Sequence, residues 1–224
     1  MGLVHEGMAQ HGTAVFTTRQ TMGKGQRGKQ WISEPGKNLA LTIVVQPKGL
    51  STSEVFKLSM ATAVALRNSL EKFIGEGTTI KWPNDIYWRD RKAAGILIEN
   101  VIQSKKWRFA VVGIGCNINQ VRFPGLQRKA VSIKQITGKE YDPKEIAQQI
   151  CNEFKKQWER MKSDASGIAA DYQHHLYKLN ERMKLRHENR LFEAVIKGVN
   201  SHGQLVVQHA LEEKFNVGEV EWVR

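Results

Sequence analysis

The sequence predicts an α+β fold in which helices flank a mixed, mostly antiparallel sheet and a small all-β unit follows at the C-terminal end. Three observations support this prediction: β-prone runs lie close together in the middle of the chain, two stretches have helical periodicity, and the residues after Met183 form only short β runs between polar turns. The 224 residues are enough for one fair-sized domain and a small second one, which we place at residues 1–182 and 183–224.

In chain order, the first half combines β-prone runs with one long helix. Residues 1–7 have the character of the end of a helix, and residues 19–38 that of a long loop. Ser51 and Glu54 form a capping-box pattern, which predicts a helix over residues 51–73 with apolar side chains on much of its circumference. Strands are predicted at residues 13–18, 39–46, 78–82, 94–102 and 107–113, the last three as an antiparallel meander.

The second half begins with two predicted helices. Asp142 suits the N-cap of the first helix, and Pro143 suits its first turn. The apolar side chains of this helix share one stripe: Ile146, Ile150, Phe154, Trp158 and Met161. The apolar side chains of the second, shorter helix are Ile168, Tyr172, Leu176 and Leu179. Short strands at residues 191–199, 205–208, 214–217 and 219–223, with a hairpin turn at residues 200–203, then indicate a small SH3-like β-barrel.

Composition restricts the classes of protein to be considered. The net charge of +12 suits acidic protein partners, phosphate-bearing substrates or nucleic acid, but no basic run is interleaved with aromatic residues, so we expect no DNA binding. No apolar run is long enough for a membrane span and residues 1–11 are not a secretory signal, so we expect no membrane association. The two cysteines, Cys116 and Cys151, are too few for a disulfide framework, which favours a cytoplasmic location.

Residues 23–28, Gly-Lys-Gly-Gln-Arg-Gly, form a glycine loop that fits two nucleotide-binding patterns, and we reject both. The dinucleotide fingerprint requires a helix directly after the loop, whereas a strand is predicted here. The P-loop pattern requires Ser or Thr at the position of Gln30 and also requires a helix. Two interpretations stay open: a loop whose backbone amides and cations bind an anion, or a mobile charged loop without a ligand.

A second motif, Lys-Trp-Pro-Asn-Asp at residues 81–85, coincides with the end of the strand predicted at residues 78–82. Pro83 excludes helical geometry at Trp82, so Lys81 comes at the end of an extended segment, where its ammonium group suits a carboxylate or an α-phosphate. An ordinary turn is the alternative interpretation, because Pro and Asn are frequent in turns. The segment Lys-Ala-Ala-Gly-Ile-Leu at residues 92–97 makes the combination more specific.

Together with Gly-Ile-Gly-Cys-Asn at residues 113–117, these motifs resemble those of biotin protein ligases in order and spacing, and the resemblance extends from about residue 12 to the C-terminus. It implies a catalytic domain like that of class II aminoacyl-tRNA synthetases and a two-step reaction. Biotin and ATP, with Mg²⁺, would give biotinyl-5′-AMP and pyrophosphate. The biotinyl group would then pass to a lysine of a biotin carboxyl carrier protein, in acetyl-CoA carboxylase or another biotin-dependent carboxylase. Either a monomer or a homodimer is compatible with this activity.

The resemblance also implies roles for particular residues. The catalytic residues would be Lys81 and Arg27. The residues that bind biotin would be Gln20, Gly23, Lys24, Gly25, Gln26, Lys81, Gly95 and Gly113. The residues that bind ATP or the adenylate would be Lys24, Gln26, Arg27, Trp31, Asn84 and Asn117. No metal ligands can be named, since H-x-x-x-H is absent and His174 and His175 are adjacent.

The chain departs from the family pattern in two ways. Lys24 and Gln26 replace two loop arginines, which weakens a bidentate grip on phosphate. The strand and Ser-Thr-Asn segment that usually open the catalytic domain and bond the ureido ring of biotin do not precede residue 12, and neither does a DNA-binding domain. We therefore expect either a truncated start or a chain that has lost part of its biotin pocket. Two alternative functions stay open: a lipoate or octanoate ligase, and a truncated, catalytically silent biotin-binding homologue.

Overall fold

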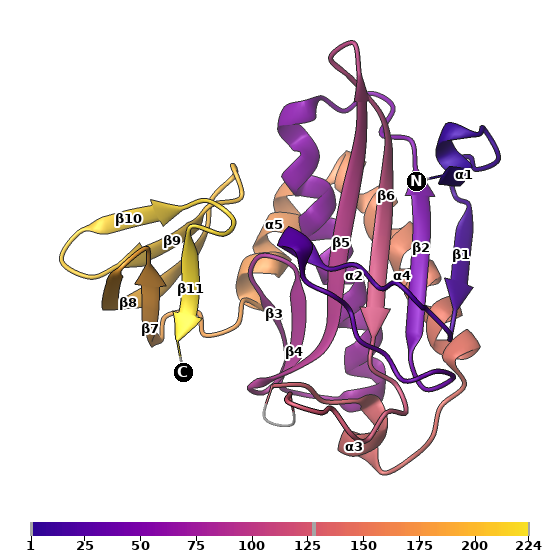
Figure 1. Cartoon of the computed structure of the whole chain (residues 1–224). Coiled ribbons are helices and arrows are strands. Elements are labelled where there is room, and N and C mark those ends of the chain that lie inside the picture. Colours follow the sequence, from indigo (N-terminus) through magenta and orange to yellow (C-terminus); the bar gives the residue numbers. More distant parts are fainter. Residues whose placement is uncertain (1, 127–128, 224) are drawn as a thin grey trace.

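The computed structural model describes residues 2–126 and 129–223, and in this part of the chain the strands form two sheets (Figure 1). The larger sheet has six strands in the order β1-β2-β6-β5-β4-β3. Its strands are β1 (Ala14–Thr17), β2 (Leu39–Val45), β3 (Thr78–Lys81), β4 (Asp85–Trp88), β5 (Arg91–Gln103) and β6 (Lys106–Cys116). All neighbouring pairs of these strands are antiparallel. The predicted antiparallel meander is thus confirmed, whereas the predicted mixed character is not found among the described strand pairs.

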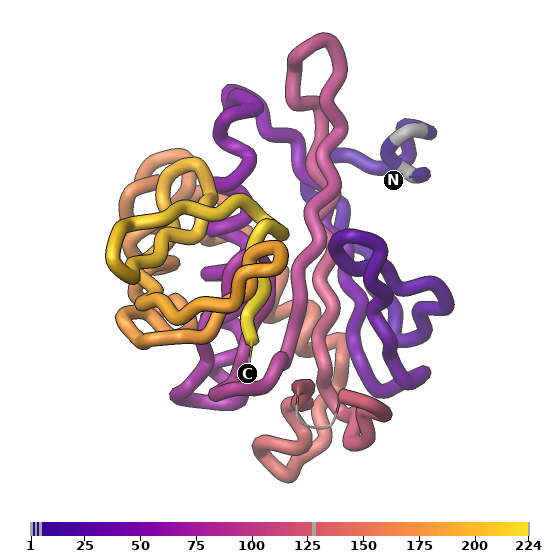
Figure 2. Tube along the Cα trace, turned by 60° about the vertical axis from the view of Figure 1, so that its left-hand side comes forward, coloured from indigo at the N-terminus to yellow at the C-terminus, as the bar shows by residue number. Residues whose placement is uncertain are grey.

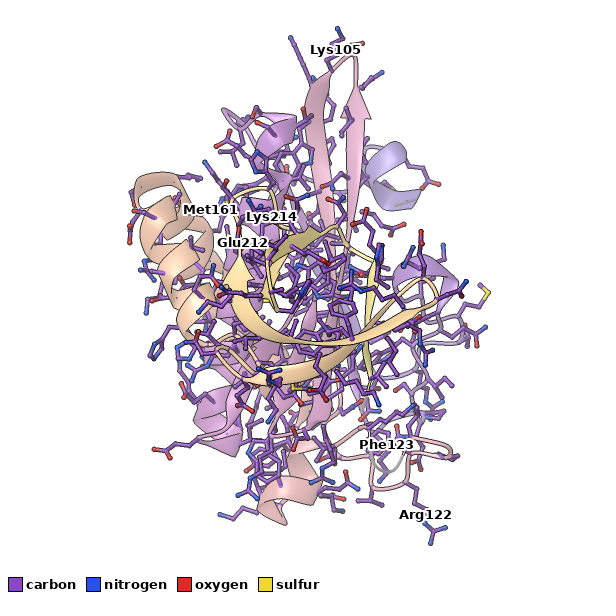
Figure 3. The ribbon with its side chains drawn as sticks, turned by 90° about the vertical axis from the view of Figure 1, so that its left-hand side faces the viewer. Lys105, Arg122, Phe123, Met161, Glu212 and Lys214 are labelled. Atoms are coloured by element: carbon purple, nitrogen blue, oxygen red, sulfur yellow. The ribbon has the colours of Figure 1, made fainter. Side chains whose placement is uncertain are left out.

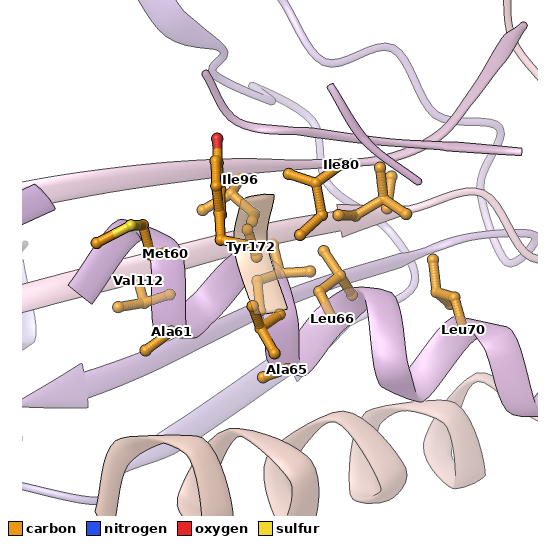
Figure 4. Close-up of a cluster of buried hydrophobic side chains, with 14 of the residues drawn as sticks. Met60, Ala61, Ala65, Leu66, Leu70, Ile80, Ile96, Val112 and Tyr172 are labelled. Atoms are coloured by element: carbon orange, nitrogen blue, oxygen red, sulfur yellow. The ribbon is translucent and has the colours of Figure 1, made fainter. Parts of the chain in front are cut away.

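Helix α2 (Val55–Ile74) lies between the larger sheet and helix α4 (Pro143–Ser163), as Figures 1 and 4 show. This sandwiched position explains why apolar residues occur on much of the circumference of α2. On its sheet side, Met60 and Leu66 face Ile96 and Val112 of the central strands (Figure 4). The predicted capping box is present, because the Ser51 backbone N–H donates to Glu54 Oε2 at 2.9 Å. It belongs to a short 3₁₀ turn, η2 (Thr52–Glu54), that precedes the helix.

The shorter helices are α1 (Gly2–His5), α3 (Ile133–Thr137) and α5 (Ala165–His174), and a 3₁₀ turn, η1 (Gln26–Gly28), lies in the glycine loop. Neither α3 nor β4 was predicted. Helix α5 also ends before Leu176 and Leu179, which we expected on it. The chain leaves the helix there because its backbone pairs with β3 instead: the Ile80 N–H donates to the His175 carbonyl and the Tyr177 N–H to the Ile80 carbonyl, both at 2.8 Å.

The smaller sheet has five antiparallel strands in the order β10-β9-β8-β7-β11. They are β7 (Arg182–His187), β8 (Arg190–Val199), β9 (Leu205–Gln208), β10 (Glu212–Phe215) and β11 (Val220–Val223). The predicted hairpin turn connects β8 and β9, where the Asn200 N–H donates to the Gln204 carbonyl at 3.0 Å. Within the described residues β10 and β11 do not pair with each other, so the strands do not close into the barrel that we expected.

Strands β5 and β6 project as a hairpin beyond the body of the molecule, with the C-terminal sheet and the N-terminal segment on opposite sides (Figure 2). Lys105 lies at the tip of this hairpin, and Arg122 and Phe123 lie at the opposite end of the molecule (Figure 3). None of the helices in the described ranges combines the length and apolarity that a membrane crossing requires. The glycine loop crosses the larger sheet on the face opposite α2 and α4 (Figure 1). Residues of this loop line the cleft that contains the candidate site.

Candidate active site

A cleft of ≈ 1080 Å³ lies between the glycine loop, the β3–β4 turn and the C-terminal sheet. The predicted site residues that line it are Gln20, Lys24, Gly25, Gln26, Arg27, Trp31, Lys81, Asn84, Gly95 and Gly113. Gly23 and Asn117 do not line it. Residues to which we assigned no role also line it, among them Asp85, Tyr87, Lys92, Gly115 and Trp222. The structure therefore brings segments from most of the chain's length to one cleft.

The Lys-Trp-Pro-Asn-Asp motif forms the turn between β3 and β4. Strand β3 ends at Lys81, as expected, and Lys81 and Asp85 are register partners across the two strands. Asn84 fixes the turn to β5 through two hydrogen bonds. Its side-chain amide donates to the Ile96 carbonyl at 2.5 Å, and its backbone carbonyl accepts from the Ile96 N–H at 2.8 Å. Trp82 is buried beneath the turn. These contacts hold the start of the Lys81 side chain in a fixed place.

The Lys81 ammonium group lies among aromatic side chains at one side of the cleft. Its Nζ atom donates to the Tyr87 hydroxyl at 3.3 Å. The ring centroids of Tyr87, Tyr177 and Trp222 all lie within 5.7 Å of the same atom. Because aromatic faces attract a cation, these rings can hold the ammonium group at this side of the cleft, where it can bind an anionic group.

An ion pair and an indole ring line the cleft. Lys92 Nζ lies 2.7 Å from Asp85 Oδ1, and 5.5 Å from the centroid of the Trp31 ring. The Trp31 ring lies directly on Gly115, where an added Cβ would come within 2.5 Å of the ring. Gly95 is similarly close to Lys92, because a Cβ there would lie 3.0 Å from its Nζ. Glycine at these two positions leaves space for the side chains of Trp31 and Lys92.

The glycine loop is a narrow hairpin over the cleft. The Gly25 N–H donates to the Lys29 carbonyl at 2.7 Å, and the Trp31 N–H to the Gly23 carbonyl at 3.0 Å. A Cβ on Gly23 would lie 2.3 Å from the Trp31 carbonyl oxygen, so Gly23 permits the close approach of the two sides although it does not line the cleft. Arg27, at a left-handed φ of 56°, occupies the tip of the loop.

The tip of the glycine loop contacts the C-terminal sheet. Arg27 Nη1 donates to the carbonyl of Gly218, in the turn between β10 and β11, at 2.6 Å. A Cβ on Gly218 would lie 1.9 Å from the same nitrogen, and Gly218 also has a φ of +87°. A side chain at residue 218 would therefore displace the guanidinium of Arg27 from this position, and the positive φ independently favours glycine there.

Asn117 has a different environment from that expected of a nucleotide-binding residue. It is buried, and its side-chain amide donates to the carbonyls of Lys92 at 3.3 Å and Val131 at 3.2 Å. Its backbone N–H donates to the Ala93 carbonyl at 2.9 Å. These bonds connect the end of β6 to the start of β5 and to the segment before α3. The predicted contact with ATP stays a prediction, and the geometry adds a structural role.

Neither a thiol nucleophile nor a preformed metal site is evident around the cleft. Burial raises the pKa of the Cys116 thiol to about 12, so this thiol stays neutral at ordinary pH. In residues 2–126 and 129–223, no group of three or more His, Cys, Asp or Glu side chains is placed to hold a metal ion. The cleft instead offers cations, backbone amides and aromatic rings, which suit an anionic substrate with an apolar part.

Comparison with known proteins identifies similar sequences. The model of the Biotin/lipoate A/B protein ligase family matches residues 4–119. The bifunctional ligase/repressor BirA of Bacillus subtilis is 29% identical over 204 residues, which are 89% of this chain and 62% of BirA. The biotin–[acetyl-CoA-carboxylase] ligase of Paracoccus denitrificans is 29% identical over 203 residues, covering 87% of this chain and 83% of the relative. The chain thus spans 62% of the length of its bifunctional relative and more of the monofunctional one.

Solved structures show the same fold. The biotin protein ligase of Aquifex aeolicus, in complex with biotin and ATP, superposes with a TM-score of 0.81 at 25% identity, covering 96% of this chain and 90% of that one. The biotin protein ligase of Leishmania major, in complex with biotinyl-5-AMP, superposes with a TM-score of 0.61 at 25% identity, covering 92% and 89% of the two chains. The similarity therefore includes the C-terminal sheet as well as the larger sheet.

Proposed function

The chain belongs to the Biotin/lipoate A/B protein ligase family, and we propose that it is a biotin protein ligase. It would activate biotin with ATP to biotinyl-5′-AMP and then transfer the biotinyl group to a lysine of a biotin carboxyl carrier protein, such as that of acetyl-CoA carboxylase. One observation carries the proposal: the cleft brings Lys81 of the Lys-Trp-Pro-Asn-Asp turn beneath the cationic glycine loop. The similarity to ligases that bind biotin, ATP and biotinyl-5-AMP supports it.

In the first step, the carboxylate of biotin attacks the α-phosphorus of ATP and pyrophosphate leaves. Two anions have to approach each other, so the enzyme has to supply positive charge at the point where they meet. Lys81 is suited to this role, because β3 and the bonded turn fix the base of its side chain while its ammonium group lies in the cleft. Mg²⁺ would arrive with the phosphates of ATP.

The glycine loop would cover the reacting groups. Lys24, Gly25 and Gln26 line the cleft at positions where backbone amides and side chains can contact biotin and the adenylate. Arg27 would contact phosphate oxygens, and its bond to Gly218 places its guanidinium at the rim of the cleft. Trp31 would pack against the ligand from its position on Gly115. Excluding water in this way protects the acyl-adenylate from hydrolysis until the carrier lysine arrives.

In the second step, the amine of the carrier lysine attacks the acyl carbon of biotinyl-5′-AMP, and AMP leaves. The net charge of +12 favours rapid encounter with an acidic carrier domain. We further propose a catalytic domain of the class II synthetase type at residues 1–182 and an SH3-like unit at residues 183–224. Helix α5 ends at His174 and β7 begins at Arg182, within one residue of this boundary, which supports it. A cytoplasmic location and a monomer or homodimer complete the proposal.

Biotin-dependent exchange of pyrophosphate into ATP tests the adenylation step. The wild type should catalyse exchange, and Lys81→Ala should reduce its rate by roughly 10²–10³-fold, since one stabilising cation is lost from the transition state. Lys105→Ala is the matched control, because Lys105 is an exposed lysine at the far tip of the β5–β6 hairpin (Figure 3). Exchange with lipoate or octanoate but not with biotin would reassign the substrate. No exchange with any of these acids would contradict the proposed activity.

A further inference from the structure

We propose that Tyr87, Tyr177 and Trp222 form an aromatic cage that positions Lys81 for adenylation, so that the C-terminal sheet contributes a positioning residue to the active site. The Lys81 Nζ atom lies 4.7 Å from the centroid of the Tyr87 ring, 5.2 Å from that of Trp222 and 5.7 Å from that of Tyr177. All three distances fall within the range of a cation–π interaction. The proposal deepens the ligase function proposed above and rests on it.

The three rings come from different parts of the chain and form a continuous row. Tyr87 belongs to β4, Tyr177 to the segment between α5 and β7, and Trp222 to β11. The ring centroids of Tyr87 and Tyr177 are 5.2 Å apart, and those of Tyr177 and Trp222 are 5.8 Å apart. Each ring therefore limits the movement of the next, and the three rings form one packed surface beside the ammonium group.

Tyr177, in the middle of the row, is fixed at both ends. Its hydroxyl donates to Asp90 Oδ1 at 2.7 Å, and its backbone N–H donates to the carbonyl of Ile80 at 2.8 Å. Ile80 directly precedes Lys81 on β3, so the backbone of Tyr177 is attached beside the base of the lysine side chain. Tyr177 is also buried, with an exposed fraction of 7%. Tyr177 thus connects β3 to the C-terminal sheet.

Trp222 is the member of the cage that the C-terminal sheet supplies. It is the register partner of Leu185, which is fully buried, so the backbone of β11 is fixed against β7. Its side chain is half-buried and lines the cleft. This position makes Trp222 suitable for mutation, because removing its ring opens the cage without emptying the main hydrophobic core.

The cage would act on the reaction through the geometry of Lys81. An aromatic face attracts an ammonium group without neutralising its charge, so the lysine stays able to bind the carboxylate of biotin and later the adenylate. Without one face, the ammonium group has more positions available and is further from the reacting atoms on average. Positioning of this kind affects the rate of the chemical step more than the binding of the rest of the substrate.

The experiment compares Trp222→Leu, Trp222→Phe and Phe192→Leu in the full chain. Phe192→Leu is the matched control, because Phe192 is a half-buried aromatic residue of the same sheet whose ring packs on Phe215 and His209. In pyrophosphate exchange, Trp222→Leu should lower kcat about ten-fold with little change in the KM for biotin. Trp222→Phe, which keeps an aromatic ring, should retain most of the wild-type kcat. Phe192→Leu should retain the wild-type kcat. Adding Trp222→Leu to Lys81→Ala should cause no further loss.

A measurement without substrates separates this proposal from the ligase activity itself. In protein with ¹³C-labelled lysine, ring currents should shift the ε-CH₂ signal of Lys81 upfield of the other lysines, and Lys81→Arg assigns it. Trp222→Leu should move this signal towards the others, and Phe192→Leu should not. An unshifted wild-type signal, or equal kcat losses in Trp222→Leu and Phe192→Leu, would overturn the cage. A shifted signal without pyrophosphate exchange would confirm the cage geometry and contradict the ligase function.

Discussion

The two motifs that define the cleft are held in place by different means. The turn at residues 81–85 belongs to the larger sheet: Lys81 pairs with Asp85 across β3 and β4, and Asn84 makes two bonds to Ile96 of β5. Trp82, within this turn, is only 2% exposed, and its indole N–H donates to the Gly203 carbonyl at 2.9 Å. This motif is therefore part of the folded core.

The glycine loop has little support of its own. Backbone bonds across its own hairpin keep its shape, but Met22 beside it is 84% exposed, and the bond from Arg27 to Gly218 fixes its tip to the C-terminal sheet. The two motifs therefore differ in their roles. The folded core fixes the position of Lys81, and the weakly held glycine loop covers it. A substrate can then enter when the glycine loop moves, without unfolding of the turn that carries Lys81.

The largest expected difference between the two regions is in stability. Trp82→Ala removes a buried indole and leaves the Gly203 carbonyl without its donor, so the free energy of unfolding should fall by about 3–5 kcal/mol. Trp31→Ala, in the segment after the glycine loop, should cost less than about 1 kcal/mol, because Trp31 is half-buried and its ring N–H has no hydrogen-bond partner among the described residues. Urea unfolding measures both values.

Equal losses in the two tryptophan variants would contradict this comparison, because they would show that the loop segment is as firmly packed as the turn. A slope of the unfolding free energy against urea that stays constant is the internal control, since a changed slope would indicate a changed unfolded or native state.

Asn117→Ala should have the next largest effect and tests a role assigned from the sequence. The side-chain amide donates to the carbonyls of Lys92 and Val131, the second of these bonds being buried, so its removal should lower the free energy of unfolding by about 1–3 kcal/mol. Titration with ATP should show whether the KM changes as well. A stable variant with a strongly raised KM for ATP would restore the nucleotide-binding role in place of the structural one.

The sequence identified the features that depend on neighbouring residues. The capping box of Ser51 and Glu54, the strand that ends at Lys81 and the turn at residues 200–203 are all local patterns, and the structure contains each of them. A capping box was also present at Ser132 and Gln135 and could have indicated α3. Strand β4 was missed because its four residues follow a turn motif and are too few to show a period.

The rest of the site depends on contacts between distant residues. Arg27 and Gly218 are 191 positions apart, and no local pattern relates them. The same holds for Trp222, whose place beside Lys81 results from the position of the whole C-terminal sheet. The resemblance implied that Asn117 contacts the nucleotide, and this contact stays a prediction. Its amide bonds to the Lys92 carbonyl just beyond the end of β6 at Cys116, and no local pattern indicates this second, structural role. The helical pattern that included Leu176 failed because pairing with β3 competes with the helix.

Gly218→Ala tests how the glycine loop is held in place, and it leaves the turn at residues 81–85 unchanged. An added Cβ would collide with the guanidinium of Arg27, so the loop tip should leave the β10–β11 turn. Trypsin should then cleave after Lys24, Arg27 or Lys29 about five- to ten-fold faster, which corresponds to roughly 1 kcal/mol in the population of the open loop. Gly49→Ala is the matched control: its φ of +82° imposes the same backbone strain as the +87° of Gly218, but no atom lies within 4 Å of its added Cβ.

An unchanged cleavage rate in Gly218→Ala, or an equal increase in Gly49→Ala, would show that the contact between Arg27 and Gly218 does not hold the loop. The pattern of fragments gives a second criterion. Cleavage should increase within residues 24–29 and not at the lysines of the C-terminal sheet, because the expected change is confined to the glycine loop.

The smallest expected effect concerns Glu54, which directly precedes helix α2. The bond from Lys57, and then that from the Ser51 backbone N–H, lowers the pKa of Glu54 from 4.5 to about 2. A carboxylate with a lowered pKa stabilises the fold above its unfolded-state pKa and loses this contribution as the pH falls through its folded-state pKa. Glu54→Gln, which keeps a cap acceptor, should therefore be about 0.5–1 kcal/mol less stable than the wild type at neutral pH, and the difference should disappear between about pH 4.5 and pH 2. Urea unfolding across this range measures the difference, with Glu76→Gln at an exposed turn as the control. A difference that persists unchanged to the acid end would assign the effect to the altered amide geometry and not to the charge.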